Sequence, residues 1–88
     1  MKMQEITNFL DKKIEKDSEF IKITFFELRI KMNLTEEETE TFIEFSKTRL
    51  KNLGYKTFET GEKYIIENKE KTVERNELVI ATKNNKNI

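Results

Sequence analysis

The side chains of this chain that are able to do chemistry are almost all charged. It has 17 Lys and Arg, 17 Asp and Glu, and neither His nor Cys. The usual near-neutral general base and the strongest protein nucleophile are therefore both missing. The acidic run Glu36–Glu40 has neither the alternating ligands nor the central glycine of a calcium-binding loop. We predict that the protein is not an enzyme and that it carries neither a cofactor nor a metal ion.

The charges are segregated along the chain although the net charge is zero. Residues 35–46 hold five Glu and no base, whereas residues 47–58 hold four bases and no acid. One interpretation is structural, because acids stabilise the start of a helix and bases stabilise its end through the helix dipole. The other is functional, because a surface of one sign attracts a partner of the opposite sign. The sequence is compatible with both.

Apolar spacing and capping signals predict the helices that must position these charges. The first helix is predicted over residues 3–16 from the spacing of Met3, Ile6, Leu10 and Ile14. Residues 18–23 alternate weakly and predict either a short strand or an extended linker. Two Thr-x-x-Glu capping boxes predict helices over Thr24–Asn33 and Thr35–Leu53. Gly54 is suited to the left-handed conformation that ends a helix.

Strands are predicted after the last helix, over Tyr55–Phe58, Lys63–Glu67 and Leu78–Thr82. The nine polar residues 68–76 form either a loop or the outer part of a long hairpin. In a hairpin, alternation would put Lys69 and Lys71 on one face and Glu70 on the other.

The length of 88 residues is that of one domain. We predict a single domain over residues 1–82 and a short polar tail over residues 83–88. The longest apolar run is Leu78–Ala81, far short of the roughly 20 residues of a membrane-spanning helix. We therefore expect a cytoplasmic protein that does not associate with a membrane.

The order of elements over residues 24–82 resembles the winged helix-turn-helix superfamily. The resemblance is carried by two helices separated by the turn Asn33-Leu34, by Leu50, Leu53, Gly54 and Tyr55, and by the hairpin after them. It implies an α+β fold with three helices and a C-terminal β-hairpin wing. In the common version the second helix of the motif reads the major groove of double-stranded DNA. Here Glu36, Glu37, Glu38 and Glu40 lie at that end of the helix, and the phosphates would repel them.

Some small winged-helix proteins of plasmids and phages use this helix for dimerisation and bind DNA mainly through wings and flanking basic groups. Examples are the centromere-binding adaptors of tubulin-like partition systems and the accessory factors that mark a conjugative transfer origin. The resemblance implies a DNA-binding protein of plasmid or phage partition, conjugative transfer or transcriptional control. The DNA-binding residues it implies are Lys63, Asn68, Lys69, Lys71, Thr72, Arg75, Asn76 and Lys83.

Arg75 is the candidate for an AT-rich minor groove, whose deep negative potential attracts a guanidinium. The structural alternative is a polar hairpin tip whose bases are offset by Glu70 and Glu74 and serve only solvation.

The helix over Thr35–Leu53 also predicts self-association. Its apolar residues span an arc of about 160° at roughly 100° per residue, wider than the stripe of a little over about 100° that a small core needs. We predict a homodimer whose interface contains Phe42, Ile43 and Phe45. An alternative function of a different class is a protein–protein adaptor, whose acidic third helix meets a basic partner and which does not bind DNA.

Overall fold

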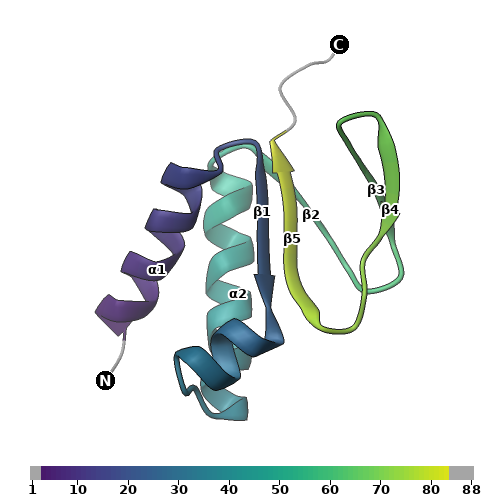
Figure 1. The fold of residues 1–88 in the computed structure, drawn as a ribbon. Helices are drawn as coiled ribbons and strands as arrows, with labels where there is room; N and C mark the ends of the chain where they lie inside the picture. Colours follow the sequence, from purple (N-terminus) through teal and green to yellow (C-terminus); the bar gives the residue numbers. More distant parts are fainter. Residues whose placement is uncertain (1–2, 84–88) are drawn as a thin grey trace.

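Three layers make up the molecule: helices, a three-stranded sheet and a two-stranded hairpin (Figure 1). The computed structural model describes residues 3–83, so the predicted tail lies outside the described residues except for Lys83. In chain order the elements are α1 (Met3–Lys16), β1 (Phe20–Thr24), the π-helix η1 (Phe26–Lys31), α2 (Glu36–Asn52), β2 (Tyr55–Phe58), β3 (Lys63–Ile66), β4 (Lys69–Thr72) and β5 (Glu77–Lys83). Within residues 3–83, no helix has the length and apolar content needed to cross a membrane.

Helices α1 and α2 begin and end within one residue of their predicted positions. The sequence signals that predict them, which are apolar spacing, a capping box and a glycine, act over only a few residues. The Thr35 hydroxyl accepts a hydrogen bond from the Glu38 backbone N–H at 3.1 Å. In return the Glu38 carboxylate accepts from the Thr35 N–H at 2.9 Å, which completes the capping box. Gly54 ends α2 with a φ of 96°, the left-handed conformation that glycine adopts without strain. The stripe of α1 buries Ile6 and Leu10.

The sequence predicted either a short strand or an extended linker over residues 18–23. Strand β1 confirms the strand. Ile21 and Ile23 are fully buried, while Lys22 between them is exposed. Strand β5 lies between β1 and β2 and is antiparallel to both. The two long helices lie beside one face of this sheet (Figure 1).

Strand β5 is buried on both of its faces. Val79 and Ala81 belong to the larger core, which also contains the buried side chains of α1 and α2. Ile80 points to the opposite face and forms a second core with Tyr64 and Val73. The sheet therefore separates two hydrophobic clusters, of which the second lies under the β3–β4 hairpin.

The β3–β4 hairpin reverses direction at Glu67 and Asn68. Their φ angles are 52° and 65°, and a two-residue turn with positive φ at both positions matches the twist of a β-hairpin. The ring of Tyr64 stacks on Phe20 with centroids 5.8 Å apart and lies 5.7 Å from the ring of Phe58. These aromatic contacts hold the hairpin against the face of the sheet that the helices leave open.

The predicted winged helix-turn-helix with three helices and a C-terminal hairpin wing is wrong. The chain is α+β, but β1 lies between the first two helices, and the five strands form two antiparallel sheets. The predicted hairpin joined residues 63–67 to 78–82, whereas within residues 3–83 β3 pairs with β4 and not with β5. The reversal at Glu67 and Asn68 makes the polar residues after it the partner of β3. The apolar β5 is then free to fill the centre of the larger sheet.

Residues 26–31 form a π-helix and not the predicted α-helix. The backbone N–H of Met32 donates to the carbonyl of Glu27, five residues earlier, at 2.9 Å. The capping box that begins the segment is nevertheless present. The Glu27 N–H donates to the Thr24 hydroxyl at 3.3 Å, and the Glu27 carboxylate accepts from the Thr24 N–H at 3.0 Å.

Glu27 also ties α1 to this junction. The Lys13 ammonium donates to the Glu27 carboxylate at 2.6 Å and to the Lys22 carbonyl at 3.0 Å. Partial burial acts to raise the pKa of Glu27, but the hydrogen bonds from Lys13 and Thr24 outweigh it. The pKa of this carboxyl therefore lies below its ordinary value of 4.5.

We expect the Glu27→Gln substitution to lower the free energy of unfolding at neutral pH and to weaken its acid dependence. Because the folded-state pKa is depressed, the stabilisation is present above 4.5 and is lost as the pH falls through the folded-state pKa. Urea denaturation at about pH 7, 5 and 3 measures the effect. Glu15→Gln is the control, because Glu15 is exposed and forms no salt bridge within residues 3–83. If Glu27→Gln and Glu15→Gln have the same pH profile, the ion pair does not stabilise the junction.

Candidate nucleic-acid interface

The β3–β4 hairpin carries five of the eight predicted DNA-binding residues, all of them exposed: Lys63, Asn68, Lys69, Lys71 and Thr72. Lys69 stands opposite Ile66 and Lys71 opposite Tyr64, and directly opposed residues share one face of a ladder. The predicted shared face of Lys69 and Lys71, away from Glu70, is confirmed. Lys69 and Lys71 therefore share the hairpin face of Tyr64 and Ile66, which pack against the larger sheet, while their own side chains stay exposed.

Arg75 and Asn76 lie apart from the hairpin turn, in the exposed turn between β4 and β5. The Asn76 carbonyl accepts a hydrogen bond from the Phe25 backbone N–H at 2.8 Å. This contact ties the turn to the start of η1. The two side chains are exposed, but the hairpin face with Lys69 and Lys71 does not include them.

Lys83, the last predicted residue, ends β5 and lies next to the end of α2. Its ammonium donates to the Leu53 carbonyl at 3.2 Å and lies 4.8 Å from the centroid of the Tyr55 ring. Six residue steps of β5 separate it from Glu77, a distance of about 20 Å. The eight predicted residues thus fall into three groups and do not form one continuous patch.

Only some of the basic side chains are neutralised by an acid. The salt bridges within the described residues are Lys13–Glu27, Lys22–Glu77, Lys47–Glu59 and Arg49–Asp11. Among residues 3–83, no salt bridge involves the bases of the hairpin or of the turn after it. Their charged groups are therefore available to phosphate oxygens, which accept most protein–DNA hydrogen bonds.

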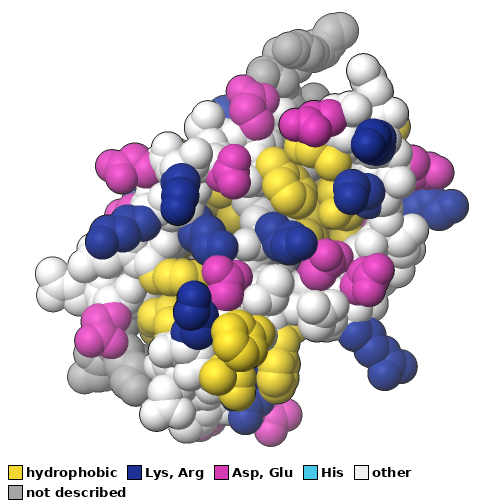
Figure 2. Space-filling view, viewed as in Figure 1, with side chains coloured by type: hydrophobic (Ala, Val, Ile, Leu, Met, Phe, Trp, Pro, Cys, Tyr) yellow, Lys and Arg dark blue, Asp and Glu magenta, His cyan; other side chains and the backbone are white. Residues whose placement is uncertain are grey.

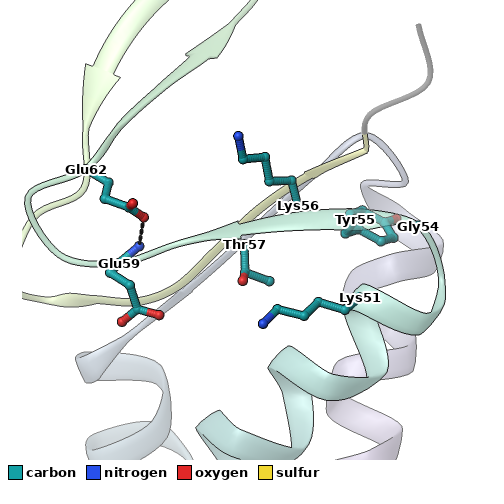
Figure 3. A pocket seen from close by; sticks show the side chains of 7 residues that line it. All are labelled: Lys51, Gly54, Tyr55, Lys56, Thr57, Glu59 and Glu62. Atoms are coloured by element: carbon teal, nitrogen blue, oxygen red, sulfur yellow. Dashed lines mark hydrogen bonds between the residues drawn. The ribbon is translucent and has the colours of Figure 1, made fainter. Parts of the chain in front are cut away.

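The end of α2 and strand β2 each add one basic residue that sequence reasoning left out of the site. Lys51 and Lys56 line an open hollow of about 560 Å³ between α2 and β2. Figure 3 shows Lys51 and Thr57 on one side of β2 and Lys56 on the other. Neither lysine forms a salt bridge within the described part of the chain. The signal that could have identified them was the run of bases without an acid over residues 47–58.

Two carboxylates at the rim of the hollow already have partners. Glu59 accepts from the Lys47 ammonium at 2.8 Å, and Glu62 accepts from the Glu59 backbone N–H at 2.6 Å (Figure 3). The hollow is therefore mixed in charge on the Glu59 side and basic on the Lys51 side.

Two groups of like-charged side chains lie at opposite ends of the molecule. The hairpin turn, the end of α2 and the end of β5 all lie at one end in Figure 1, and the start of α2 and η1 lie at the other. We call the first the basic end and define it by Lys51, Lys56, Lys69 and Lys83. We call the second the acidic end and define it by the exposed side chains Glu36, Glu37 and Glu40.

One of the three residues of the predicted dimer interface lies inside the chain. Phe42 is fully buried, with its ring centroid 6.0 Å from that of Phe9. Ile43 and Phe45 are half-buried and pack against the larger core. Of the three residues, only Ile43 and Phe45 have surface to offer to a second chain.

Comparison with known protein families, curated proteins and solved structures found no match to this chain. The candidate interface therefore depends on its own geometry and charge.

We expect Tyr64→Ala to release the hairpin from the sheet and to lower the free energy of unfolding by about 3 kcal/mol, as for other buried aromatic residues. Backbone amides of β3 and β4 should exchange with deuterium faster, while those of β1 and β5 change less. Ile65→Ala is the matched control, because Ile65 is the next residue in the strand but is 67% exposed. Equal effects of the two substitutions would show that the aromatic contacts do not hold the hairpin.

Proposed function

We propose that the protein binds double-stranded DNA through the β3–β4 hairpin and the basic end. The supporting observation is that the side chains of Lys69 and Lys71 are exposed beside Tyr64 and Ile66 on one hairpin face and take part in no salt bridge within residues 3–83. A two-stranded antiparallel ribbon fits the major groove, which is about 12 Å wide. Lys51, Lys56 and Lys83 would contact phosphates beside the groove.

The acidic end is not suited to contact DNA. Duplex DNA carries one negative charge per roughly 1.7 Å of its axis, so Glu36, Glu37 and Glu40 are repelled from it. These three side chains form no salt bridge within the described residues. The start of α2 therefore points away from the DNA when the basic end approaches it.

A net charge of zero does not oppose this proposal, because the two ends act independently. Glu37 and Lys51 are 14 residues apart on α2, a separation of about 21 Å along the helix axis. The Debye length in physiological salt is about 8 Å. A phosphate at the basic end is therefore screened from the acidic end but not from the nearest ammonium groups.

Replacing both Lys69 and Lys71 with Ala tests the hairpin contact. Each phosphate contact contributes about −0.9 to the slope of log affinity against log salt on duplex DNA. We expect the slope to become shallower by about 1.8 per bound chain, with equal weakening on all sequences. Fluorescence anisotropy with labelled AT-rich and mixed duplexes at several salt concentrations measures both quantities.

The control is the substitution Lys12→Ala, which removes a positive charge from an exposed position within α1, outside the residues that define the basic end. The control should retain the parental slope. If both variants bind as the parent does, the hairpin is only a solvated surface feature. If the parent binds no duplex at low salt, the DNA-binding proposal is wrong.

A second candidate function is a protein–protein adaptor, favoured by the exposed carboxylates of the acidic end. Such a surface attracts a basic partner of any kind.

Replacing Glu37 and Glu40 with Gln distinguishes the two functions. If the protein binds DNA, this substitution leaves affinity equal or slightly higher, because it removes repulsion from phosphates. If the protein is an adaptor, the same substitution instead weakens binding of the protein to a lysine-rich peptide. A large loss of DNA affinity with unchanged circular dichroism would show that α2 itself reads DNA.

A further inference from the structure

Three large apolar side chains are exposed together at the acidic end. Phe25, Phe26 and Ile30 are 45%, 57% and 59% exposed, respectively. They lie on η1 and the residue before it, and we call them the apolar patch. Figure 2 shows hydrophobic side chains gathered at the foot of the molecule, where η1 lies in Figure 1. A contiguous exposed apolar surface on a small protein commonly marks an interaction site.

The apolar patch lies outside both hydrophobic cores. The buried residue of η1 is Leu28, which belongs to the larger core. Met32, just after η1, also packs against that core. The π-helical winding leaves Phe26 and Ile30 outside, and π-helical turns are rare and often occur at functional sites.

Charged side chains of both signs border the apolar patch. Arg29 and Lys31 lie on η1 itself, and the Arg29 guanidinium is 5.4 Å from the centroid of the Phe25 ring. Glu36 and Glu37 begin α2 after a short connection. Within residues 3–83, none of these four charges takes part in a salt bridge.

We propose that the apolar patch binds the same patch of a second copy of this chain, which forms a homodimer with two-fold symmetry. Such an interface joins identical surfaces and must be complementary to itself. A rim that carries both bases and acids can meet this requirement, because a two-fold axis can set Lys31 of one chain toward the acids of its partner. The zero net charge means that two copies do not repel each other.

This interface differs from the one predicted at Ile43 and Phe45 of α2. It lies at the acidic end, so both basic ends and both hairpins face outward in the dimer. The inference does not depend on DNA binding, because self-association is measured without DNA.

Sedimentation equilibrium at about 1–100 µM, a range that covers micromolar dissociation constants, tests the proposal. We expect the parent to be a dimer at the upper end of this range. Phe26→Ser should raise the dissociation constant at least about tenfold, as for a central interface residue. Phe45→Ser is the matched control and should leave the dissociation constant unchanged. Circular dichroism and thermal melting verify that each variant is folded.

A charge exchange tests the orientation of the two copies independently of any loss of apolar surface. Lys31→Glu sets acids against acids, and Glu37→Lys sets bases against bases, so each substitution alone should weaken the dimer. Both substitutions in one chain reverse the two signs together and should restore most of the lost affinity.

A monomeric parent across this range would overturn the proposal. So would a dimer that Phe45→Ser disrupts and Phe26→Ser leaves intact, because the interface would then lie on α2. Failure of the doubly substituted chain to recover affinity would overturn the two-fold arrangement. None of these outcomes alters the DNA-binding proposal, which the hairpin variants test separately.

Discussion

The rest of the structure depends on the burial of strand β5 on both faces. It pairs with β1 on one edge and β2 on the other, so the three-stranded sheet does not form without it. Val79 and Ala81 complete the core beneath the helices, and Ile80 completes the core beneath the hairpin. A strand with apolar side chains on both faces is typical of a sheet that is covered by other elements on both sides. In a chain with only 35% hydrophobic residues, few segments can fill this position.

The second core explains why a polar hairpin is held in a fixed position. Strand β4 has no buried residue, and its sequence Lys-Glu-Lys-Thr offers no apolar face. The hairpin is held by Tyr64 of β3, which reaches Phe20 and Phe58 on the sheet. Because one strand supplies the packing and the other supplies the bases, Lys69 and Lys71 stay exposed on an anchored element. A hairpin anchored in this way fixes the backbone that carries the two lysines before a partner arrives, which reduces the entropy cost of binding.

Local signals made some elements predictable, and pairing between distant segments made others unpredictable. The capping box at Thr35 and the glycine at position 54 act within a few residues, so α2 could be bounded from sequence. Strand β4 could not, because all its side chains are exposed and its conformation follows from the turn at Glu67 and Asn68. The same limit applies to the site. The exposure of Lys69 and Lys71 could be predicted from the polarity and alternation of the sequence. The position of Lys51 near β2 could be known only from the fold.

Some of the segregated charges are explained by interactions within the fold, and others are not. The hydrogen bonds and salt bridges show which charges belong to the first group. Glu38 is used in the capping box of α2, and Lys47 and Arg49 are held by Glu59 and Asp11. These residues are explained by the folding of the chain.

Glu40 lies beyond the first turn of α2, where the helix dipole contributes little, and it forms no salt bridge within residues 3–83. Lys51 suits the dipole at the other end of the helix, but that interaction is worth only about 0.3–1 kcal/mol at an exposed position. Lys56 lies on a strand, where no helix dipole acts on it. Charges that the fold leaves unpaired at opposite ends of one helix are the part of the pattern that calls for partners outside the chain. A phosphate backbone suits the basic end, and a second copy suits the mixed rim of the apolar patch.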